Sequence, residues 1–529
     1  MKTPALEKPA TNIALPMGRV LSFATITAAG FVLGKVSGIM REMVVSAHFG
    51  LGSGLDAYVL AGVVPTTINN IVAGSAITAA VMPTFARYLA AGRRDEFWRA
   101  ASVITNIVLL VTGAVTALGM LLAGPIISLI AGASPPSTQA LAATMLVIMM
   151  PTLLLGAALN MLMAMLNSVD RFAGPALIFL ALNVGMIAAV ILLTPIIGVV
   201  AVAWGFLIGV ILQVVIQVVE LRIEHPHYTW RIDWHHPALR EVFAAFVPIT
   251  ALAITAQINL VVDKTMAASL PAGSVSALYY ADVVLGAFYM LGYSLGIAVF
   301  PNLSRLAAVN DLESTRRTVV TSLRLLVFIL APLTLALMAF AAPAVGLIFE
   351  RGAFDARAVQ MTAQALAMYA VGLIAIAALQ VLQRVYYAFS DSATPLVVGA
   401  LTALAHVALN LILMRYWAHA GIALSTSITA IVAVVALVVL LERRVRGIEP
   451  VELLGFLSRC VLFALVAIGP MVWLAAILPL GDGTVARVIT AALALLGGIV
   501  YLLLARTTRT RESELLLQPV WGFFRRGKA

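Results

Sequence analysis

The chain has 529 residues, of which 62% are hydrophobic and 11% are charged, and its formal net charge is +10. Soluble proteins have ~45–50% apolar and ~25% charged residues, so the composition excludes an ordinary soluble domain. The basic residues are spread over many short connections, which argues against a nucleic-acid-binding protein and indicates membrane topology and contact with anionic lipids. Cys460 is the single cysteine, so an intramolecular disulfide is excluded.

Apolar segments long enough to cross ~30 Å of hydrocarbon recur along the whole chain. We predict about fourteen transmembrane helices, at 19–40, 57–85, 100–123, 139–165, 173–194, 197–219, 241–268, 276–304, 318–343, 360–387, 393–414, 420–441, 456–478 and 485–506. Lys2 and Lys8 precede the first segment, as in a signal peptide. That segment is longer than the ~7–15 residues of a signal core, so we expect it to be a retained span.

Positive charge alternates between the connections. Most of the 33 Lys and Arg residues fall in every second connection, and Arg87, Arg93, Arg94 and Arg99 share one of them. The positive-inside rule places these connections in the cytoplasm. Because both termini belong to the same set, we predict that both are cytoplasmic, which requires an even number of spans.

Two parts of the chain resemble each other. VMPTFARYLA at 81–90 matches VFPNLSRLAA at 299–308, and LNSVDRFAGPAL at 166–177 matches YYAFSDSATPLV at 386–397, with a proline aligned to a proline in each pair. Six spans per copy is an even number, so both copies enter the membrane in the same direction and are related by a pseudo-two-fold axis along the membrane normal. Two such lobes are typical of a transporter with a central cavity.

The sequence therefore predicts an all-α polytopic membrane protein with two six-helix lobes and two additional C-terminal helices. The predicted parts are an N-lobe at 1–220, a cytoplasmic linker at 221–240, a C-lobe at 241–442, and the last two spans with a basic tail at 443–529. The sequence has no Gly-rich phosphate loop, His/Cys metal cluster or nucleophile elbow, which favours a transporter over an enzyme. We expect no cofactor and no bound metal.

Charged residues within the first two apolar segments are the first candidates for function, because a charge in hydrocarbon persists only beside a cavity or a partner. Lys35 and Arg41 lie toward the outer end of the first span, and Asp56 opens the second. We interpret them as a substrate-binding wall that holds an anionic head group. The alternative is that Arg41 reaches the membrane surface and pairs with Asp56 or Glu42.

Two adjacent amides follow in the second span. Asn69 and Asn70 come after Pro65 in an otherwise apolar helix. They are candidates for lining a polar, substrate-binding cavity. The alternative is that they form hydrogen bonds between helices.

The second lobe contains its own polar cluster. Asp263 and Lys264 are adjacent, His406 and Asn410 lie one helical turn apart, and Thr426 follows in the next span. Asp263, His406, Asn410 and Thr426 are candidate ion-coupling residues, either as ligands of a monovalent cation or with a proton on Asp263. The alternative is that Asp263 is a boundary charge paired with Lys264 or another neighbour.

Four short motifs, KVSGIMRE, GLDAY, VMPTF and LYYAD, occur in this order. With the number of spans and the repeat, they resemble the MurJ/MviN family of lipid II flippases, within the multidrug/oligosaccharidyl-lipid/polysaccharide exporter superfamily, over nearly the whole chain. The resemblance implies alternating access in a bacterial cytoplasmic (inner) membrane. A lipid-linked saccharide head group is carried between the lobes, and its polyprenyl tail lies in a groove formed with the last two spans. It also implies substrate-binding roles for Arg41 and Asp56 and a cation-site role for Asp263.

The chain departs from the family pattern at several positions. Lys35 and Val283 stand where the family usually has arginine, Asn69 and Asn70 replace a pair of arginines, and Asn410 replaces a cation-site acid. The changes at Asn69, Asn70 and Val283 remove positive charges that would meet a pyrophosphate, and Lys35 is a point charge where arginine would offer a fork.

We therefore predict a flippase that moves an undecaprenyl-pyrophosphate-linked saccharide, foremost the peptidoglycan precursor lipid II, from the inner to the outer leaflet during cell wall synthesis. A flippase for an exopolysaccharide or another lipid-linked glycan is the alternative, and a drug exporter of the same superfamily or a membrane glycosyltransferase fits less well. The expected partners are the lipid-linked saccharide, membrane lipids and proteins of peptidoglycan or glycan synthesis, without nucleic acid. We expect coupling to protons, a monovalent cation or the membrane potential.

Overall fold

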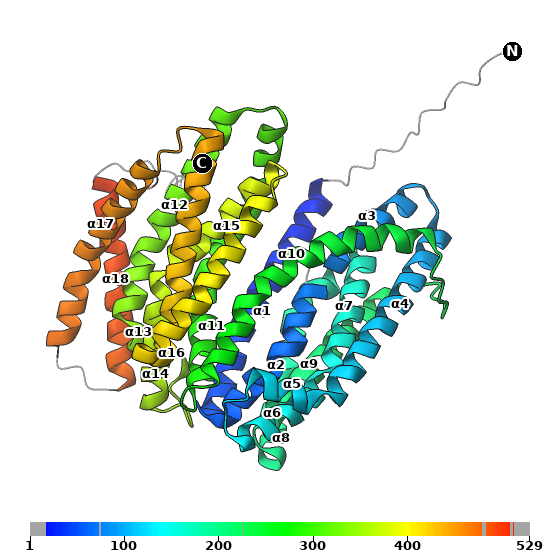
Figure 1. Ribbon diagram of the computed structural model, residues 1–529, viewed down its shortest axis with the longest axis horizontal. Helices are drawn as coiled ribbons and strands as arrows, with labels where there is room; N and C mark the ends of the chain where they lie inside the picture. Colours follow the sequence, from blue (N-terminus) through cyan, green and yellow to red (C-terminus); the bar gives the residue numbers. More distant parts are fainter. Residues whose placement is uncertain (1–16, 73–75, 225, 479–482, 508–511, 513–529) are drawn as a thin grey trace.

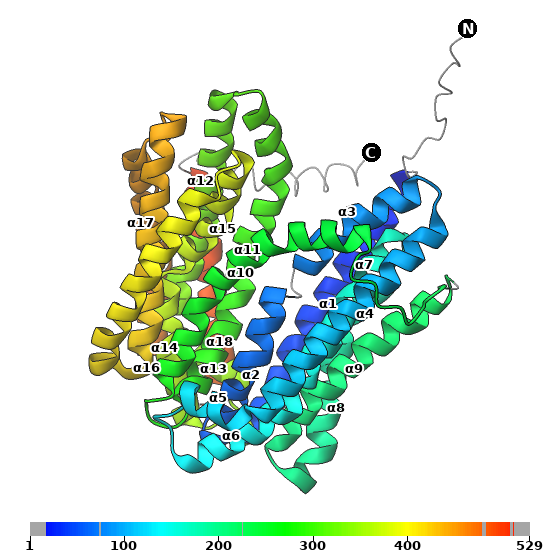
Figure 2. The ribbon, with the colours of Figure 1, turned by 45° about the vertical axis from the view of Figure 1, so that its right-hand side comes forward.

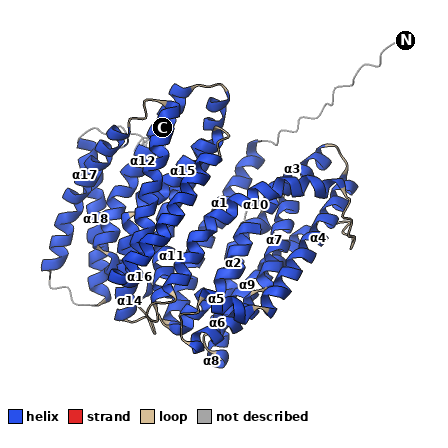
Figure 3. Cartoon of the chain, viewed as in Figure 1, coloured by secondary structure: helices blue, strands red, loops and turns tan. Residues whose placement is uncertain are grey.

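The chain folds into helices, without a strand, throughout the residues that the structure describes (Figure 3). The structure is a computed structural model that describes residues 17–72, 76–224, 226–478, 483–507 and 512. The two chain ends that were predicted to be cytoplasmic, 1–16 and 513–529, lie outside these residues.

Eighteen helices follow one another within the described residues. They are α1 (Met17–Phe49), α2 (Ser53–Val72), α3 (Ala76–Ala90), α4 (Arg94–Leu121), α5 (Ala123–Ile130), α6 (Pro136–Met149), α7 (Pro151–Ser168), α8 (Ala173–Ile197), α9 (Val200–Arg222), α10 (Pro237–Ala267), α11 (Ser274–Ala308), α12 (Leu312–Ala339), α13 (Ala341–Phe349), α14 (Ala356–Val371), α15 (Leu373–Ala388), α16 (Ala393–Val445), α17 (Pro450–Ile477) and α18 (Thr484–Thr507).

The helices have the length and composition of membrane spans. Counted over the described residues, nine are long and apolar enough to cross a membrane, and α14 with α15, bent by 49°, forms a tenth. α16 counts once, although its backbone reverses at Ala418 and Ser425 donates to the carbonyl of His406 at 3.2 Å, so it contains two antiparallel spans. The predicted all-α polytopic membrane fold is confirmed, and the count of fourteen spans is approximate.

Several spans that the sequence predicts as continuous are broken into two helices. α6 ends at Met149 and α7 begins at Pro151, within the predicted span 139–165. Proline lacks the amide proton that a helix interior needs, so a helix ends or bends there. The break between α14 and α15 falls at Gly372, where helix α16 comes so close that a side chain would meet Ser427.

The helices form two bundles that lie side by side (Figure 1). We call α1 to α9 the N-lobe and α11 to α16 the C-lobe. α10 runs obliquely from one to the other, and α17 and α18 lie at the far edge of the C-lobe (Figures 1 and 2). The first turns of α10 are part of an N-lobe core, where Ala238 and Val242 pack with Phe85 and Trp98. Near its other end, α10 packs against α16.

The two C-terminal helices are fixed to the C-lobe. Cys460 of α17 and Tyr501 of α18 are buried in one cluster with Phe328 of α12, and the Tyr501 hydroxyl donates to the Phe328 carbonyl at 3.0 Å. At the other end of α18, Arg487 forms an ion pair with Glu350 at 2.7 Å. A hydrophobic cluster and one polar contact at each end therefore hold α18 in place.

The predicted repeat is visible in the backbone of the turns. Asp170 and Ser390 occupy matching positions of the two copies and have φ angles of 60° and 57°. Gly92 and Asn310 also match, with φ of 69° and 53°. In all four turns the next amide bonds to the carbonyl five residues earlier, at 2.9–3.0 Å. The two lobes thus end equivalent helices with the same left-handed cap.

A third pair of matching turns differs in its residue. Between α8 and α9, Gly198 has φ 58° and ψ −140°, and at the reversal inside α16, Ala418 has φ 47° and ψ −129°. This region of backbone space is open almost only to glycine, because a β-carbon collides with the chain. The C-lobe keeps the turn of the N-lobe but places an alanine in it.

We expect Ala418→Gly to raise the thermal unfolding midpoint of the purified protein in detergent. Glycine removes strain of roughly 1–3 kcal/mol at this conformation, which exceeds the ~0.4–1 kcal/mol cost of its freedom in the unfolded chain. Ala420→Gly, a buried position in the helix that follows, is the matched control and should lower the midpoint, at a cost of ~1 kcal/mol. If the unfolding midpoint of Ala418→Gly is at or below that of the wild type, the backbone at Ala418 is not strained.

Candidate functional site

Arg41 lies in a network that joins three helices. Its Nε donates to Oε1 of Glu42 at 3.0 Å, its Nη1 donates to Oδ1 of Asn183 on α8 at 3.0 Å, and its Nη2 also pairs with Glu42. From the C-lobe, the hydroxyl of Tyr279 on α11 donates to the same Glu42 oxygen at 2.8 Å. Glu42 is almost fully buried, whereas Arg41 keeps 18% of its side-chain exposure. The carboxylate is thus shared by both lobes, and the Arg41 side chain stays partly exposed.

Asp56 has a different role from the one that the sequence indicates. It does not pair with Arg41. Its Oδ2 accepts from the Gly273 amide at 2.6 Å, and its Oδ1 accepts from the Ser276 amide at 2.8 Å and from the Ser276 hydroxyl at 2.7 Å. Asp56 is 5% exposed, so it does not line an open cavity in this structure. The carboxylate caps the N-terminus of α11 and joins the two lobes.

The same end of the molecule, where α1 is followed by α2, holds further contacts between the lobes; we call it the closed end. The amide of Ala353 donates to the carbonyl of Ala47 at 2.8 Å, and the hydroxyl of Ser134 donates to the carbonyl of Ala268 at 2.9 Å. Gly50 has φ 56° and lies against the carbonyl of Ala353, so close that any side chain would collide. Backbone meets backbone at this end, which leaves no passage between these segments.

The remaining predicted substrate-binding residues lie apart from this network. Lys35 is exposed on α1, roughly 9 Å along the helix axis from Arg41. Asn69 lies against Gly156 of α7, inside the N-lobe. Asn70 is exposed and donates to Oε1 of Gln257 on α10 at 3.3 Å. Asn70 therefore forms a hydrogen bond between helices, as the alternative for this pair expects, whereas Asn69 packs against α7 and its Oδ1 is buried without a hydrogen-bond partner.

The predicted ion-coupling residues come together from α10 and both halves of α16. Nε2 of His406 lies 2.6 Å from Oδ1 of Asp263, and Nδ2 of Asn410 donates to the same oxygen at 2.8 Å. Ser425 and Thr429 approach Nδ1 of His406 at 3.3 Å and 3.4 Å. His406 is 1% exposed and Asp263 keeps 13%. The carboxylate is therefore satisfied by an imidazole and an amide, in a site that still has an opening.

One predicted member of this cluster lies outside it, and two members, Ser425 and Thr429, were not among the candidate ion-coupling residues. Thr426 donates to the carbonyl of Ile422 within its own helix at 3.2 Å. Thr429 takes the place near His406. Its spacing of one turn from Ser425 is the signal that would have found it, because residues four apart share a helix face.

The alternative interpretation of Asp263 was a boundary charge paired with Lys264 or another neighbour, and the structure pairs it with His406 instead of Lys264. The Lys264 ammonium lies 5.8 Å from the centre of the Tyr279 ring, and it interacts electrostatically with Asp282, Asp263 and Asp56. Because Tyr279 also binds Glu42, Lys264 lies between the Arg41 network and the Asp263 cluster. Over the described residues, no group of three or more His, Cys, Asp or Glu side chains is placed to hold a metal ion.

Two repeated helical lobes that are joined tightly at one end, with buried charges between them, define an alternating-access membrane transporter. The family model described as "Lipid II flippase MurJ" matches residues 45–510. The chain belongs to this family, so the resemblance found in its motifs is confirmed. It is a multi-pass protein of the bacterial inner membrane.

Curated relatives extend over most of the chain. It is 29% identical over 470 residues to the lipid II flippase MurJ of Burkholderia cenocepacia, which covers 85% of this chain and 90% of that protein. It is 28% identical over 426 residues to the probable lipid II flippase MurJ of Vibrio cholerae, which covers 78% and 81%.

Solved structures share the fold. A lipid II flippase MurJ in an inward closed conformation superposes with a TM-score of 0.75 at 23% identity, covering 94% of this chain and 99% of that one. An inward-facing multidrug resistance MATE family transporter of the MOP superfamily gives 0.67 at 13% identity, covering 79% and 95%.

We expect Asp56→Ala to loosen the closed end. The variant removes charge-assisted hydrogen bonds worth ~1.5–3 kcal/mol each, so amide exchange at residues 273–276 should accelerate by roughly tenfold or more, as measured by hydrogen–deuterium exchange mass spectrometry.

The matched control is Asp355→Ala. Asp355 caps α14 through the Ala358 amide at 2.8 Å, within the C-lobe. The control should accelerate exchange near Ala358 alone. Unchanged protection at 273–276 in Asp56→Ala would show that this contact does not hold the lobes together.

Proposed function

We propose that the protein is a flippase that moves lipid II from the inner to the outer leaflet of the cytoplasmic membrane by alternating access. The family match over residues 45–510 carries this proposal. The network around Arg41 supports it, because a partly exposed guanidinium between two lobes is suited to an anionic head group. The substrate is a lipid-linked saccharide, and the protein acts as a transporter, not as an enzyme.

Arg41 is the residue that we propose to bind the pyrophosphate. A guanidinium has five N–H donors, and Glu42 and Asn183 do not engage all of them. A phosphate binds best to the planar fork of arginine, through two parallel hydrogen bonds. The arginines that the chain lacks, at Asn69 and Asn70, belong to positions that face α7 and α10. Their loss leaves the Arg41 network intact.

The contacts at the closed end set the free-energy cost of opening the lobes on that side. To open toward the other side, the lobes must break the contacts of Asp56 with α11 and the bond between Ala47 and Ala353. A ligand shifts such an equilibrium only by as much as it binds one state better than the other. The head group and the coupling ion must together supply that difference.

The cluster of Asp263, His406 and Asn410 is our proposal for the coupling site. An imidazole can accept and donate a proton, and the contact of His406 with the Asp263 carboxylate at 2.6 Å supports proton coupling over a tight cation site. Lys264, on the same helix, and Asp282 of α11 are the other charged groups of this region. The membrane potential then acts on the charge of this cluster.

We propose that the termini and the basic connections face the cytoplasm. The basic connections of each lobe lie together in the structure. Arg94 and Arg171 both pair with Glu224, at 2.8 Å and 2.9 Å, and Arg444 pairs with Asp391 at 3.3 Å. The positive-inside rule supports a cytoplasmic position for this end, and the closed end then faces the periplasm.

Arg41→Ala should abolish growth of a bacterium whose own lipid II flippase is depleted, at normal abundance in the membrane, because the head group loses its cationic partner. Arg41→Lys should restore growth in part, since an ammonium is a point charge and not a fork. Arg351→Ala is the matched control. Arg351 is exposed, and its side chain donates to two carbonyls of the preceding helix, α13, so its loss should leave growth unchanged. Full growth with Arg41→Ala would remove Arg41 from substrate binding, and failure of the wild type to support growth would overturn lipid II as cargo.

Asp263→Asn should slow transport by roughly tenfold, as expected for a lost coupling of 1–3 kcal/mol, and should flatten its dependence on pH and membrane potential. Asp282→Asn, which removes a charge from the same region without a contact to His406, should change this dependence less. The measurement is lipid II exposed at the outer surface of vesicles as pH, sodium and potential are varied. An unchanged profile in Asp263→Asn would make this residue a structural partner of His406.

A further inference from the structure

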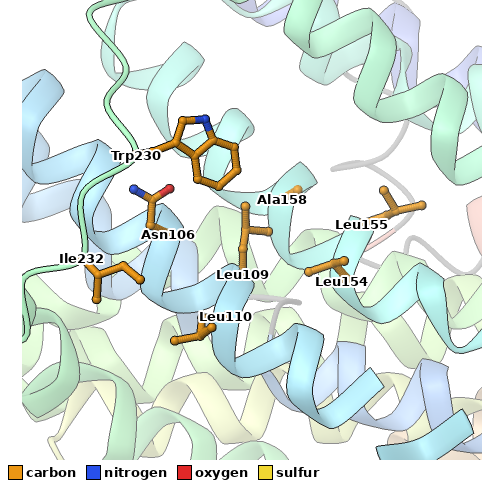
Figure 4. A pocket seen from close by; sticks show the side chains of 8 residues that line it. All are labelled: Asn106, Leu109, Leu110, Leu154, Leu155, Ala158, Trp230 and Ile232. Atoms are coloured by element: carbon orange, nitrogen blue, oxygen red, sulfur yellow. The ribbon is translucent and has the colours of Figure 1, made fainter. Parts of the chain in front are cut away.

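A groove with a volume of about 650 Å³ lies between α4 and α7 of the N-lobe (Figure 4). Its walls are Leu109 and Leu110 of α4, Leu154, Leu155 and Ala158 of α7, and Trp230 and Ile232 of the linker that follows α9, with Asn106 as the polar member. The size falls in the range of ~300–1,000 Å³ that binds one small ligand.

The linker forms one wall of the groove because α4 holds it by hydrogen bonds. Nδ2 of Asn106 donates to the carbonyls of Thr229 and Arg231, both at 2.9 Å, and the hydroxyl of Ser102 accepts from the Thr229 amide at 3.1 Å. The hydroxyl of Tyr228 donates to Oδ1 of Asn106. Extended backbone is tolerated at membrane depth only with such partners. The side chain of Asn106 is thereby fully used, so the groove offers a ligand apolar contacts alone.

The groove lies at the membrane depth that the hydrocarbon chains of lipids occupy. Counted from residue 100, where the predicted span begins, Asn106 and Leu110 lie roughly 9 Å and 15 Å along the axis, within a hydrocarbon core of ~30 Å. Figure 1 places α4 at the edge of the N-lobe, on the side away from α17. Trp230 is 86% exposed and Ile232 is 54% exposed, so this wall lies on the outer surface of the N-lobe.

A basic residue stands above the groove. Arg99 is exposed on α4, two turns before Asn106 and on the same helix face, about 10 Å closer to the end with the basic connections. Arg93 and Arg94 of this end are engaged by Glu96 and Glu224. An apolar groove below a cation matches an anionic lipid, with its chain in the groove and its phosphate at the arginine.

We propose that this groove binds one acyl chain of an anionic phospholipid of the cytoplasmic leaflet, whose phosphate lies at Arg99. The inference uses the orientation proposed above. A phospholipid is favoured over the tail of the substrate because Arg41, which binds the head group, lies on α1 beside α8 and α11. The bound chain fills the space between α4, α7 and the linker, and it stabilises the linker on the N-lobe.

The test uses the full chain in vesicles that contain phosphatidylglycerol with a photoreactive group in the middle of one acyl chain, and the labelled peptides are mapped by mass spectrometry. We expect labelling at 106–110 and 154–158. Ala158→Trp fills the groove and should lower this labelling by about tenfold. Leu110→Trp, at a side chain that is already 51% exposed, is a second variant that the fold tolerates. Leu192→Trp, on the exposed face of α8 at 69%, is the matched control and should not change it.

The head group is tested by two further comparisons. Arg99→Gln should reduce labelling by the phosphatidylglycerol probe to the level of the same probe with a phosphatidylcholine head group. Equal labelling by both probes in the wild type would overturn the assignment of an anionic lipid. Labelling that persists in both groove variants would show contact with bulk lipid alone. Loss of the label on addition of undecaprenyl phosphate would assign the groove to a polyprenyl chain and overturn the proposal.

Discussion

The carboxylate of Asp56 at the N-terminus of α11 is the contact on which the arrangement of the lobes depends. Inside a bilayer, apolar surfaces gain little by leaving lipid for protein, so polar contacts and close backbone packing decide how helices associate. The carboxylate meets two amides and a hydroxyl at the positive end of a helix dipole. The same register brings Tyr279, one turn further along α11, to Glu42 and thereby fixes Arg41 between the lobes. Lys264 then lies between the Arg41 network and the Asp263 cluster.

Most of the fold could be predicted from the sequence, because membrane spans need only length and apolar composition. The repeat was also within reach, since its turns keep prolines and left-handed residues in register. Helix breaks were harder to predict. Pro151 separates α6 from α7 although the two helices form one span, and Pro301 lies inside the unbroken helix α11, so proline alone does not decide. The reversal at Ala418 falls in the gap predicted between the spans 393–414 and 420–441, but its left-handed backbone could not be predicted, because alanine is a residue that favours helix.

In the candidate site, too, some contacts could be predicted from the sequence and others could not. His406 and Asn410 could be placed together because they are one turn apart and both are polar in an apolar span. The partners of Asp56 could not be predicted, because two of its three donors are backbone amides, which every residue except proline carries. Asn69 meets Gly156 for a reason that sequence does not show, namely the close approach of α2 to α7. Contacts that depend on side-chain type were predictable, and those that depend on backbone proximity were not.

The attachment of α17 and α18 affects how the two lobes move in the membrane. Both helices pack against α12 and its neighbours in the C-lobe, through Tyr501 with Phe328 and Arg487 with Glu350. They widen the perimeter that the C-lobe presents to lipid. When two joined bodies tilt against each other in a viscous film, the one with the larger perimeter meets more drag and turns through the smaller angle. The N-lobe should therefore carry out most of the tilting, with the C-lobe acting as the anchored half of the transporter.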